Sequence, residues 1–397
     1  MDCYRLSERT RFYSLGHNVA LADRQRDGAC AGRSARRHTS CSTRAHTALL
    51  MVLTLRDMSL GWLGRVAGYL GLVVCSGCGQ ERSLESFGGP TMGSHYSVVY
   101  AHEAGQPGSE VLHREVDAVL GELDQQMSLW RTDSDIAQFN SLPANSCQTV
   151  PAPILELVRL GDYLARESNG AFDVTVEPLM ELWGFSPDSV PREPPTRREL
   201  EGVRAQVGYQ ALRIDGQRLC KTADVRVDLN SIAAGYAVDR IGERLEALGL
   251  RDYLVQVNGE LKTRGRKPDG SPWRVTLELP HNEHQAQQKV FALRNNSVST
   301  SDDHSPVFGG ARHQGSRTLD AVSGTPVNHG LVSVTVIHPS ALMADGLSSL
   351  LLILGPERGW NYAQAHKIAA FFVIRADNRF IIRSNASFDL LSMERPL

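Results

Sequence analysis

The sequence predicts an α+β fold, in which a single domain combines a mixed sheet with packed helices. Helical and strand-like segments follow one another irregularly, without the βαβ alternation that builds a parallel sheet. No G-x-G-x-x-G pattern occurs, so a doubly wound dinucleotide-binding domain is not expected. Residues 88–397 show no internal repeat and no break in composition, which favours one domain over two.

The first predicted elements are one strand and two helices. Residues 96–100 form a short β run, and apolar residues recur at helical spacing over 110–127. A second helix is expected over 153–167, because Asn169 and Gly170 favour a helix end just after it.

Local signals also define the later elements. Thr196 and Glu199 form a capping-box pattern, which predicts a helix start, and residues 212–221 predict a hairpin that turns at Asp215-Gly216. A helix is expected from Ser231 to Gly249. The remaining expected elements are strands at 253–257, 274–279, 298–300 and 331–338, and a helix that Ser340 caps and that runs to Leu354.

The N-terminal region is interpreted as a leader. Residues 1–57 are expected to be a non-native upstream extension, since residues 1–50 are rich in Arg and His without apolar periodicity, and Met51 and Met58 offer later starts; a transit peptide is the alternative. Residues 58–77 predict a lipoprotein signal peptide with an apolar stretch at 66–74.

Cys78 is the predicted lipidation site, because the small residue Gly77 precedes it. The pair Cys75 and Cys78 could instead be half of a redox or zinc site. Lipidation would place the protein in the bacterial periplasm, anchored to the inner membrane, since several acyl chains suffice for stable anchoring. Residues 78–90 are then expected to be a tether and residues 91–397 the domain.

Composition excludes some classes of protein. The chain has 42 Lys and Arg against 44 Asp and Glu, a formal net charge of −2, so no nucleic-acid partner is expected. No apolar run reaches the roughly 18 residues of a membrane-spanning helix. Beyond the anchor the mature region keeps Cys147 and Cys220, and the sequence leaves open whether they pair.

The segment from Asp228 to Asp239 (DLNSIAAGYAVD) carries the strongest functional signal. A short β run bears Asp228, and Asn230 and Ser231 lead into an apolar helix with Gly235 near its start. Backbone N–H groups and the helix dipole favour an anion at such a junction, and small residues let a phosphate approach. Packing alone explains many such junctions, so other blocks must support the interpretation.

Seven further blocks accompany this segment, and their order resembles that of the ApbE family, the FAD:protein FMN transferases. The resemblance covers the chain from about Gly88 to its end. The blocks are TMGS at 91–94, MSLWRTDSDIAQFN at 127–140, GAFDVTVEPLMELWGF at 170–185, VNGELKTRG at 257–265, VSTSDD at 298–303, TLDAVSGTPV at 318–327 and LVSVTVIHPSALMADGLSSLLLILG at 331–355.

The resemblance implies an activity: transfer of FMN from FAD to a Thr or Ser of an acceptor protein through a phosphoester, with release of AMP. It also implies Mg²⁺, which prefers oxygen ligands. Asp345 and Ser349 lie one helical turn apart on one face. By resemblance they bind the metal together with Ser348 and the Ser231 carbonyl. Alternatively, Asp345 is only favoured by the helix dipole and Ser349 only packs in the interior.

The resemblance further implies a set of FAD contacts. Trp130 could stack on a flat aromatic ligand, although core packing explains such a residue equally well. Asp173 and Asp228 could accept hydrogen bonds from adenine or ribose. The implied contacts are Met92, Trp130, Ala171, Phe172, Asp173, Asp228, Ala234 and Leu319, and Ala234 stands where many relatives carry Lys or Glu.

Two blocks depart from the family pattern. Arg317 occupies the catalytic position where relatives carry a His, and Ala321 replaces a Pro. If that His is the general base, Arg cannot replace it, because guanidinium stays protonated. The segment 301–304 also differs, and His304 or His313 could act instead, although lone loop histidines usually face solvent.

Three functional hypotheses follow. The first is the Mg-dependent transferase, whose acceptor is expected to be a membrane redox-complex subunit with a Thr or Ser flavinylation site. The second is a flavin-binding lipoprotein that has lost transfer, with Arg317 paired to the FAD pyrophosphate. The third is an FAD pyrophosphatase, in which water replaces the acceptor. Sequence does not identify the acceptor, the start codon or the oligomeric state.

Overall fold

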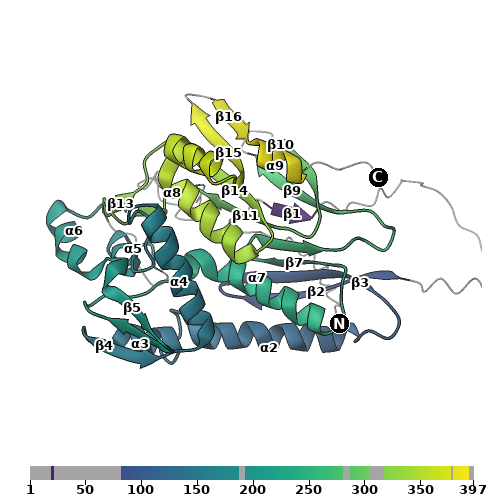
Figure 1. The fold of residues 1–397 in the computed structure, drawn as a ribbon, viewed down its shortest axis with the longest axis horizontal. Helices are drawn as coiled ribbons and strands as arrows, with labels where there is room; N and C mark the ends of the chain where they lie inside the picture. The colour runs from purple at the N-terminus through teal and green to yellow at the C-terminus, as the bar shows by residue number, and fades with distance from the viewer. Residues whose placement is uncertain are drawn as a thin grey trace, which may run out of the picture. The chain divides into compact units, whose positions relative to one another are not determined.

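An eight-stranded sheet forms the centre of the fold in a computed structural model that describes residues 19–21, 82–186, 193–279, 287–303, 316–376 and 379–392. Its strand order is β16-β15-β14-β11-β8-β7-β3-β2, and every neighbouring pair is antiparallel. Together with the helices in Figure 1, this sheet confirms the predicted α+β class. The strands are β2 (Ser83–Thr91), β3 (Ser94–His102), β7 (Tyr253–Val257), β8 (Glu260–Arg264), β11 (Ser297–Asp302), β14 (Leu331–His338), β15 (Ala369–Ala376) and β16 (Arg379–Ser384).

Both faces of the sheet are covered, so alternate residues of a strand enter different cores. On β7, Val255 packs with the helices, whereas Leu254 packs with the β9–β10 hairpin and α9. One face carries α2 (Ser109–Met127), α4 (Ala152–Glu167), α7 (Asn230–Ala247) and α8 (Ala341–Ala365). The other carries β9 (Trp273–Leu279), β10 (Gln287–Leu293) and α9 (Ala386–Ser392), and β1 (Val19–Leu21) pairs with β9.

The expected tether at 78–90 is a strand over most of its length. β2 pairs with β3 from Ser83 to Thr91. The Phe87 ring lies 5.9 Å from the Tyr100 ring and 5.2 Å from the His113 ring. A Cβ on Gly88 would lie 2.4 Å from the Tyr96 carbonyl oxygen, so this glycine permits close strand approach. The polar, Gly-rich composition of this segment suggested a flexible tether, but pairing with β3 makes it a strand.

The structure confirms the elements that were predicted from short sequence motifs. Thr196 and Glu199 form the capping box of α6 (Arg197–Val203), and Ser340 caps α8 by accepting from the Met343 N–H. The predicted hairpin is β5 (Leu212–Asp215) with β6 (Arg218–Lys221). The helix expected to end at Leu354 instead kinks at Gly355, where φ is 81°, and continues to Ala365.

A second, three-stranded sheet in the order β4-β6-β5 settles the pairing of the two cysteines. Cys147 on β4 (Ser146–Thr149) lies opposite Cys220 on β6, and the two form a disulfide. The other elements are α3 (Asp135–Ser141), α5 (Glu177–Trp183), the 3₁₀ turns η1 (Arg204–Gln206) and η2 (Tyr209–Ala211), and the pair β12 (Leu319–Asp320) and β13 (Thr325–Pro326).

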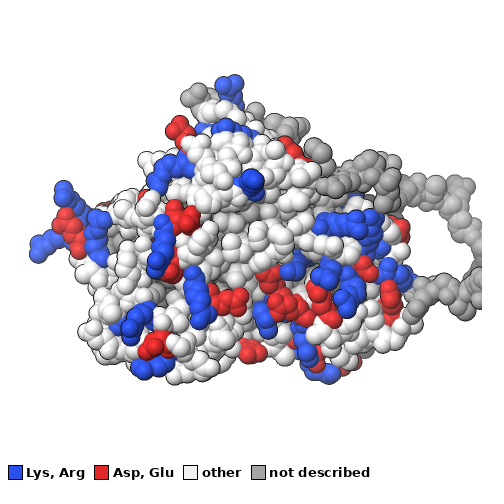
Figure 2. All heavy atoms as spheres, viewed as in Figure 1, with Lys and Arg blue, Asp and Glu red and all other residues white. Residues whose placement is uncertain are grey.

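The predicted signal peptide and Cys78 lie outside the described residues. Within the described ranges, no helix is both long and apolar enough to span a bilayer. On the face that Figure 2 shows, acidic and basic side chains are interspersed rather than segregated.

Candidate functional site

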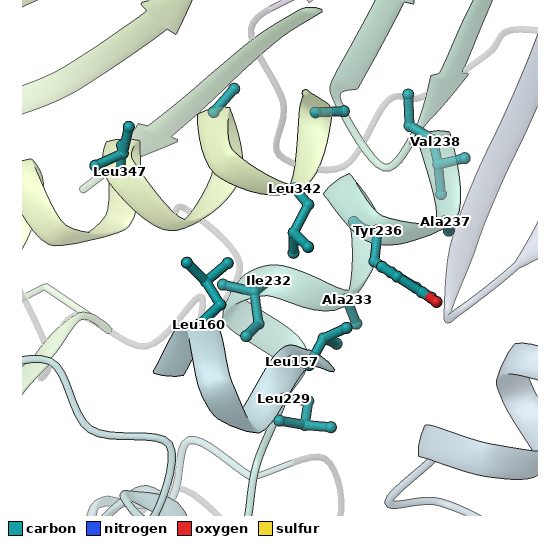
Figure 3. Close-up of a cluster of buried hydrophobic side chains, with 14 of the residues drawn as sticks. Leu157, Leu160, Leu229, Ile232, Ala233, Tyr236, Ala237, Val238, Leu342 and Leu347 are labelled. Carbon is teal, nitrogen blue, oxygen red and sulfur yellow. The ribbon is translucent and has the colours of Figure 1, made fainter. Parts of the chain in front are cut away.

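The candidate site forms where the first turns of α7 approach α8 near their crossing. Figure 3 shows α7 side chains such as Ile232 among those of α4 and α8, including Leu160 and Leu342. A Cβ at Gly235 would lie 2.5 Å from the Ala341 carbonyl oxygen and 2.7 Å from the Asp345 Cβ. The crossing therefore requires glycine at this position.

Asp239 fixes the start of α8 relative to α7. Its carboxylate accepts from the Ser340 hydroxyl at 2.7 Å and from the Ala341 and Leu342 N–H groups at 3.0 Å each. Lys262 of β8 donates to the same carboxylate at 2.6 Å. An acidic group at a helix N-terminus is favourable, and here it joins two helices and a strand.

Asp345 lies in this crossing, in the second turn of α8. Its side chain is buried, and Oδ2 accepts from the Gly235 N–H at 2.9 Å. A regular helix directs that N–H at the Ser231 carbonyl. Burial raises the pKa of Asp345 from its ordinary value of 3.8 to about 8, because charge is disfavoured away from water.

Serine hydroxyls connect Asp345 with the neighbouring strand. The Ser348 hydroxyl donates to the Asp345 carbonyl at 3.0 Å. Ser301 lies 2.8 Å from the Ser348 hydroxyl and 3.1 Å from that of Ser349, which donates to the Ser231 carbonyl at 3.5 Å. The four residues that the resemblance assigned to a metal are thus gathered in one place.

Glu260 is a further carboxylate at this place, and no local pattern in the sequence marks it as a site residue. It begins β8 directly after the Asn258-Gly259 turn and is 5% exposed. Burial, and next the charge of Asp345, raise the pKa of Glu260 well above its ordinary value. Glu260 lies in the VNGELKTRG segment, which the chain shares with the ApbE family, but only the folding of the sheet brings it near Asp345.

These donors suit a hard divalent cation. Within the described part of the chain, no group of three or more His, Cys, Asp or Glu side chains could hold a metal. The available donors are carboxylates, hydroxyls and a carbonyl, and such oxygen ligands favour Mg²⁺ over softer metals. The Glu260 Oε2 atom, buried and without a hydrogen-bond partner among the described residues, also fits a cation.

The loops that carry the implied flavin contacts are tied to one another. The Asp228 N–H donates to the Val174 carbonyl at 2.7 Å, and the Ala321 N–H donates to the Ala171 carbonyl at 3.0 Å. These bonds bring the block with Ala171, Phe172 and Asp173 beside Asp228 and beside the Leu319 strand. Sequence spacing did not reveal these pairings.

Asp173 and Asp228 both hold their own loops. The Asp173 carboxylate accepts from the Thr175 N–H at 2.8 Å and from the Tyr209 N–H at 2.7 Å. Asp228 accepts from the Asn230 N–H at 2.8 Å, directly before α7. Burial raises the pKa of both carboxyls.

Asn140 is another residue whose role sequence reasoning missed. Its side chain donates to the Val227 carbonyl at 2.9 Å and accepts from the Val227 N–H at 2.8 Å, so it continues the backbone next to Asp228. The buried Lys221 donates to the Asn140 carbonyl at 3.1 Å and follows the disulfide residue Cys220. This network connects the disulfide with the Asp228 junction.

The other implied contacts occupy different environments. Met92 and Gly93 form the β2–β3 turn with φ of 47° and 71°, as two-residue hairpins require. Trp130 follows α2 and is 60% exposed, so core packing does not explain it. Ala234 and Leu319 are buried.

Arg317 lies against the aromatic residue Phe185. It donates to the Phe185 carbonyl at 2.9 Å, and its guanidinium lies 6.0 Å from the ring centroid. Burial lowers its pKa, yet an Arg stays protonated in proteins, so it cannot take a proton. His304 and His313 lie outside the described residues.

Comparison with known proteins gives consistent relatives. The ApbE family model matches residues 92–372. The FAD:protein FMN transferase of Vibrio cholerae is 34% identical over 330 residues, which is 82% of this chain and 97% of the relative. That of Haemophilus influenzae is 32% identical over 79% of this chain and 93% of its own length.

Solved structures agree. The Pseudomonas stutzeri flavinyl transferase ApbE in its apo form has a TM-score of 0.74 and 48% identity, over 80% of this chain and 98% of its own. The flavin transferase ApbE from Vibrio cholerae has a TM-score of 0.73 and 34% identity, over 78% and 99%. The sequence blocks, the fold and these relatives together show that the chain belongs to the ApbE family.

Proposed function

We propose that this protein is an FAD:protein FMN transferase, which moves FMN from FAD to a hydroxyl of an acceptor protein. The observation that carries the proposal is the oxygen site of Asp345, Ser348, Ser349 and the Ser231 carbonyl, which is buried at Asp345 and Ser348 and open to solvent at Ser231. The chain that carries it matches named transferases over nearly their whole length. In this reaction a Thr or Ser oxygen forms a bond to the FMN phosphorus, the pyrophosphate P–O bond breaks, and AMP leaves.

The proposed cation is Mg²⁺, bound by Asp345, Ser348, Ser349 and the Ser231 carbonyl. When bound, it would neutralise charge on the pyrophosphate of FAD. The chain's own contribution is orientation: the Gly235 N–H holds Asp345, and the Ser301 hydroxyl holds Ser348 and Ser349. The Asp239 cap keeps both helices in register, so the donors are placed before the substrate arrives.

The proposed FAD site uses the loops beside this cluster. Trp130 supports it because a 60% exposed indole offers a face for an aromatic ring. Met92, Ala171, Phe172, Asp173, Asp228, Ala234 and Leu319 complete the proposed set.

Arg317 favours a second candidate, a flavin-binding protein that no longer transfers FMN. A residue that stays protonated cannot accept the acceptor's proton, whereas its guanidinium could pair with the FAD pyrophosphate. FAD hydrolysis to FMN and AMP is the third outcome to be tested.

The proposed location is the periplasmic side of the inner membrane, where lipidated Cys78 anchors the protein. The proposed acceptor is a membrane redox subunit. The Cys147–Cys220 disulfide supports an oxidising compartment, because disulfides persist there and are rare in the cytosol. Cys78→Ser should release the protein from membranes. A wild type started at Met58 that fractionates with the cytosol would contradict this location.

Mass spectrometry of reaction products tests the activity. The chain is incubated with FAD, Mg²⁺ and a Thr-containing acceptor peptide, and the peptide should gain the mass of FMN while AMP appears. Asp345→Ala should abolish the gain, whereas Asp215→Ala, on the exposed β5–β6 turn, should not change it. FMN and AMP without modified peptide would indicate a pyrophosphatase, and bound but intact FAD would indicate a binding protein.

A further inference from the structure

One carboxylate oxygen of Glu260 is buried without a hydrogen-bond partner among the described residues. Oε1 accepts from the Ser299 hydroxyl at 3.4 Å, whereas Oε2 is buried and has no hydrogen-bond partner in the described part of the chain. Leaving a buried polar atom unpaired costs about 1–3 kcal/mol, and more when it is charged. A buried carboxylate oxygen of this kind therefore indicates a ligand that the protein is built to receive.

The same hydroxyl network joins Glu260 to Asp345. The Ser299 hydroxyl lies 3.1 Å from that of Ser348, which in turn donates to the Asp345 carbonyl at 3.0 Å. Glu260 starts β8 and Asp345 lies on α8. The two serines between them are fully buried, and the last bond reaches the main-chain carbonyl of Asp345. Glu260 therefore belongs to the same interior site as the proposed metal residues.

Among the described residues, no Lys or Arg side chain balances these two carboxylates. Lys262, two residues further along the strand, donates to Asp239 instead. In the described ranges, neither Glu260 nor Asp345 forms an ion pair with Lys or Arg. Buried charges are normally paired or coordinate a metal, so two carboxyl groups that share one buried site without a protein cation would ionise on binding a doubly charged cation.

We propose that Glu260 is the second carboxylate of this site and that its Oε2 binds the divalent cation together with Asp345. Two buried carboxylates neutralise one divalent ion, so the pair also selects divalent over monovalent cations. The inference rests on the proposed function, because it concerns the cation of that reaction, and it adds a residue to the ligand set.

Calorimetric titration of the metal-free full-length chain with Mg²⁺ and with Mn²⁺ measures the effect directly, without FAD. Glu260→Gln keeps the size of the side chain and an oxygen for Ser299, but removes the charge. Its affinity for both ions should fall by at least about 10–100-fold, since even residues that only orient the ligands of a metal site typically contribute that much. Glu246→Gln is the matched control, since Glu246 accepts from Tyr253 and pairs with Arg264 away from the site.

Thermal unfolding distinguishes this role from ordinary packing. At neutral pH, metal-free Glu260→Gln should be more stable than the wild type. Burial keeps the Glu260 carboxyl protonated when folded while the unfolded carboxyl is ionised, whereas Gln is neutral in both states. The variant's gain in Tm on adding Mg²⁺ should be smaller than that of the wild type. A packing role would instead lower the Tm of the variant and leave the Mg²⁺-dependent gain unchanged.

Glu260→Asp provides the second variant should the Gln variant not fold. It keeps the charge on a shorter side chain, so Mg²⁺ should bind more weakly than in the wild type yet still be preferred over Na⁺ and K⁺. Wild-type Mg²⁺ affinity in Glu260→Gln, or in Glu260→Asp if only that variant folds, would overturn the inference. If FMN transfer persists in that case, the proposed function stands; a wild type that neither binds Mg²⁺ nor transfers FMN would refute both.

Discussion

Gly235→Ala tests the helix crossing that forms the site. The new Cβ would lie 2.5 Å from the Ala341 carbonyl oxygen and 2.7 Å from the Asp345 Cβ. Such contacts become favourable only from about 3.5 Å, so α7 and α8 would have to separate by about 1 Å. Overpacking of this kind costs about 1–3 kcal/mol, and backbone contacts place this case at the upper end.

The gain in helix propensity from Gly to Ala offsets part of that cost. Replacing Gly by Ala inside a helix stabilises it by about 1 kcal/mol. The net loss is therefore about 1–2 kcal/mol, which lowers the Tm by a few degrees. Because the Gly235 N–H also holds the Asp345 carboxylate, Mg²⁺ affinity should fall by about tenfold or more.

Urea unfolding and Mg²⁺ titration of two variants provide the assay. Gly121→Ala is the control: this exposed glycine lies in α2, and its added Cβ meets nothing within 4 Å. It should gain about 0.5–1 kcal/mol of stability and leave Mg²⁺ affinity unchanged. If Gly235→Ala is stabilised as much as Gly121→Ala and binds Mg²⁺ like the wild type, the account of the crossing is wrong.

Three other predictions concern the disulfide, Arg317 and Asp345. Replacing Cys147 and Cys220 by Ser should lower the free energy of unfolding by about 4 kcal/mol for a sequence separation of 73, and reductant should destabilise the wild type but not this variant in urea unfolding. Arg317→His should raise FMN transfer to an acceptor peptide, since a general base typically contributes about 10²–10⁴-fold, and its pH profile should follow an imidazole; an unchanged rate would show that another group takes the proton. The free energy of unfolding of the metal-free protein should fall as pH rises from 3.8 to about 8, because folded Asp345 stays protonated in this range while the unfolded carboxyl is ionised. Unfolding measured across this pH range should show no such fall when Mg²⁺ is saturating.

The sequence predicted elements that depend on neighbours along the chain. The capping box at Thr196 and the Ser340 cap were predicted correctly, because each involves contacts three residues apart. β2 was mistaken for a tether, since Gly88 suggests flexibility until its close approach to Tyr96 is known. The kink at Gly355 likewise looked like the end of a helix.

In the candidate site, too, residues with local partners could be predicted from the sequence and residues with distant partners could not. Asp345 and Ser349 could be paired from their helical spacing. The structure places Ser349 at the Ser231 carbonyl and Asp345 at the Gly235 N–H, one turn further along α7. Glu260 and Asn140 could not be assigned, because their partners come from 85 and 87 residues away, Asp345 and Val227 respectively. Only the fold brings such residues together, so no local pattern marks them.

The absence of a side chain at position 235 offers a way to sort related sequences. A larger residue there is incompatible with the present position of Ala341, so it would signal that α8 has moved away from α7. The acid at position 345 gains its orientation from the same approach, and the two positions should therefore change together. Homologues that have lost glycine at 235 along with the acid at 345 would be recognisable as descendants that no longer bind the proposed cation, even where Trp130 and the rest of the proposed flavin site are retained.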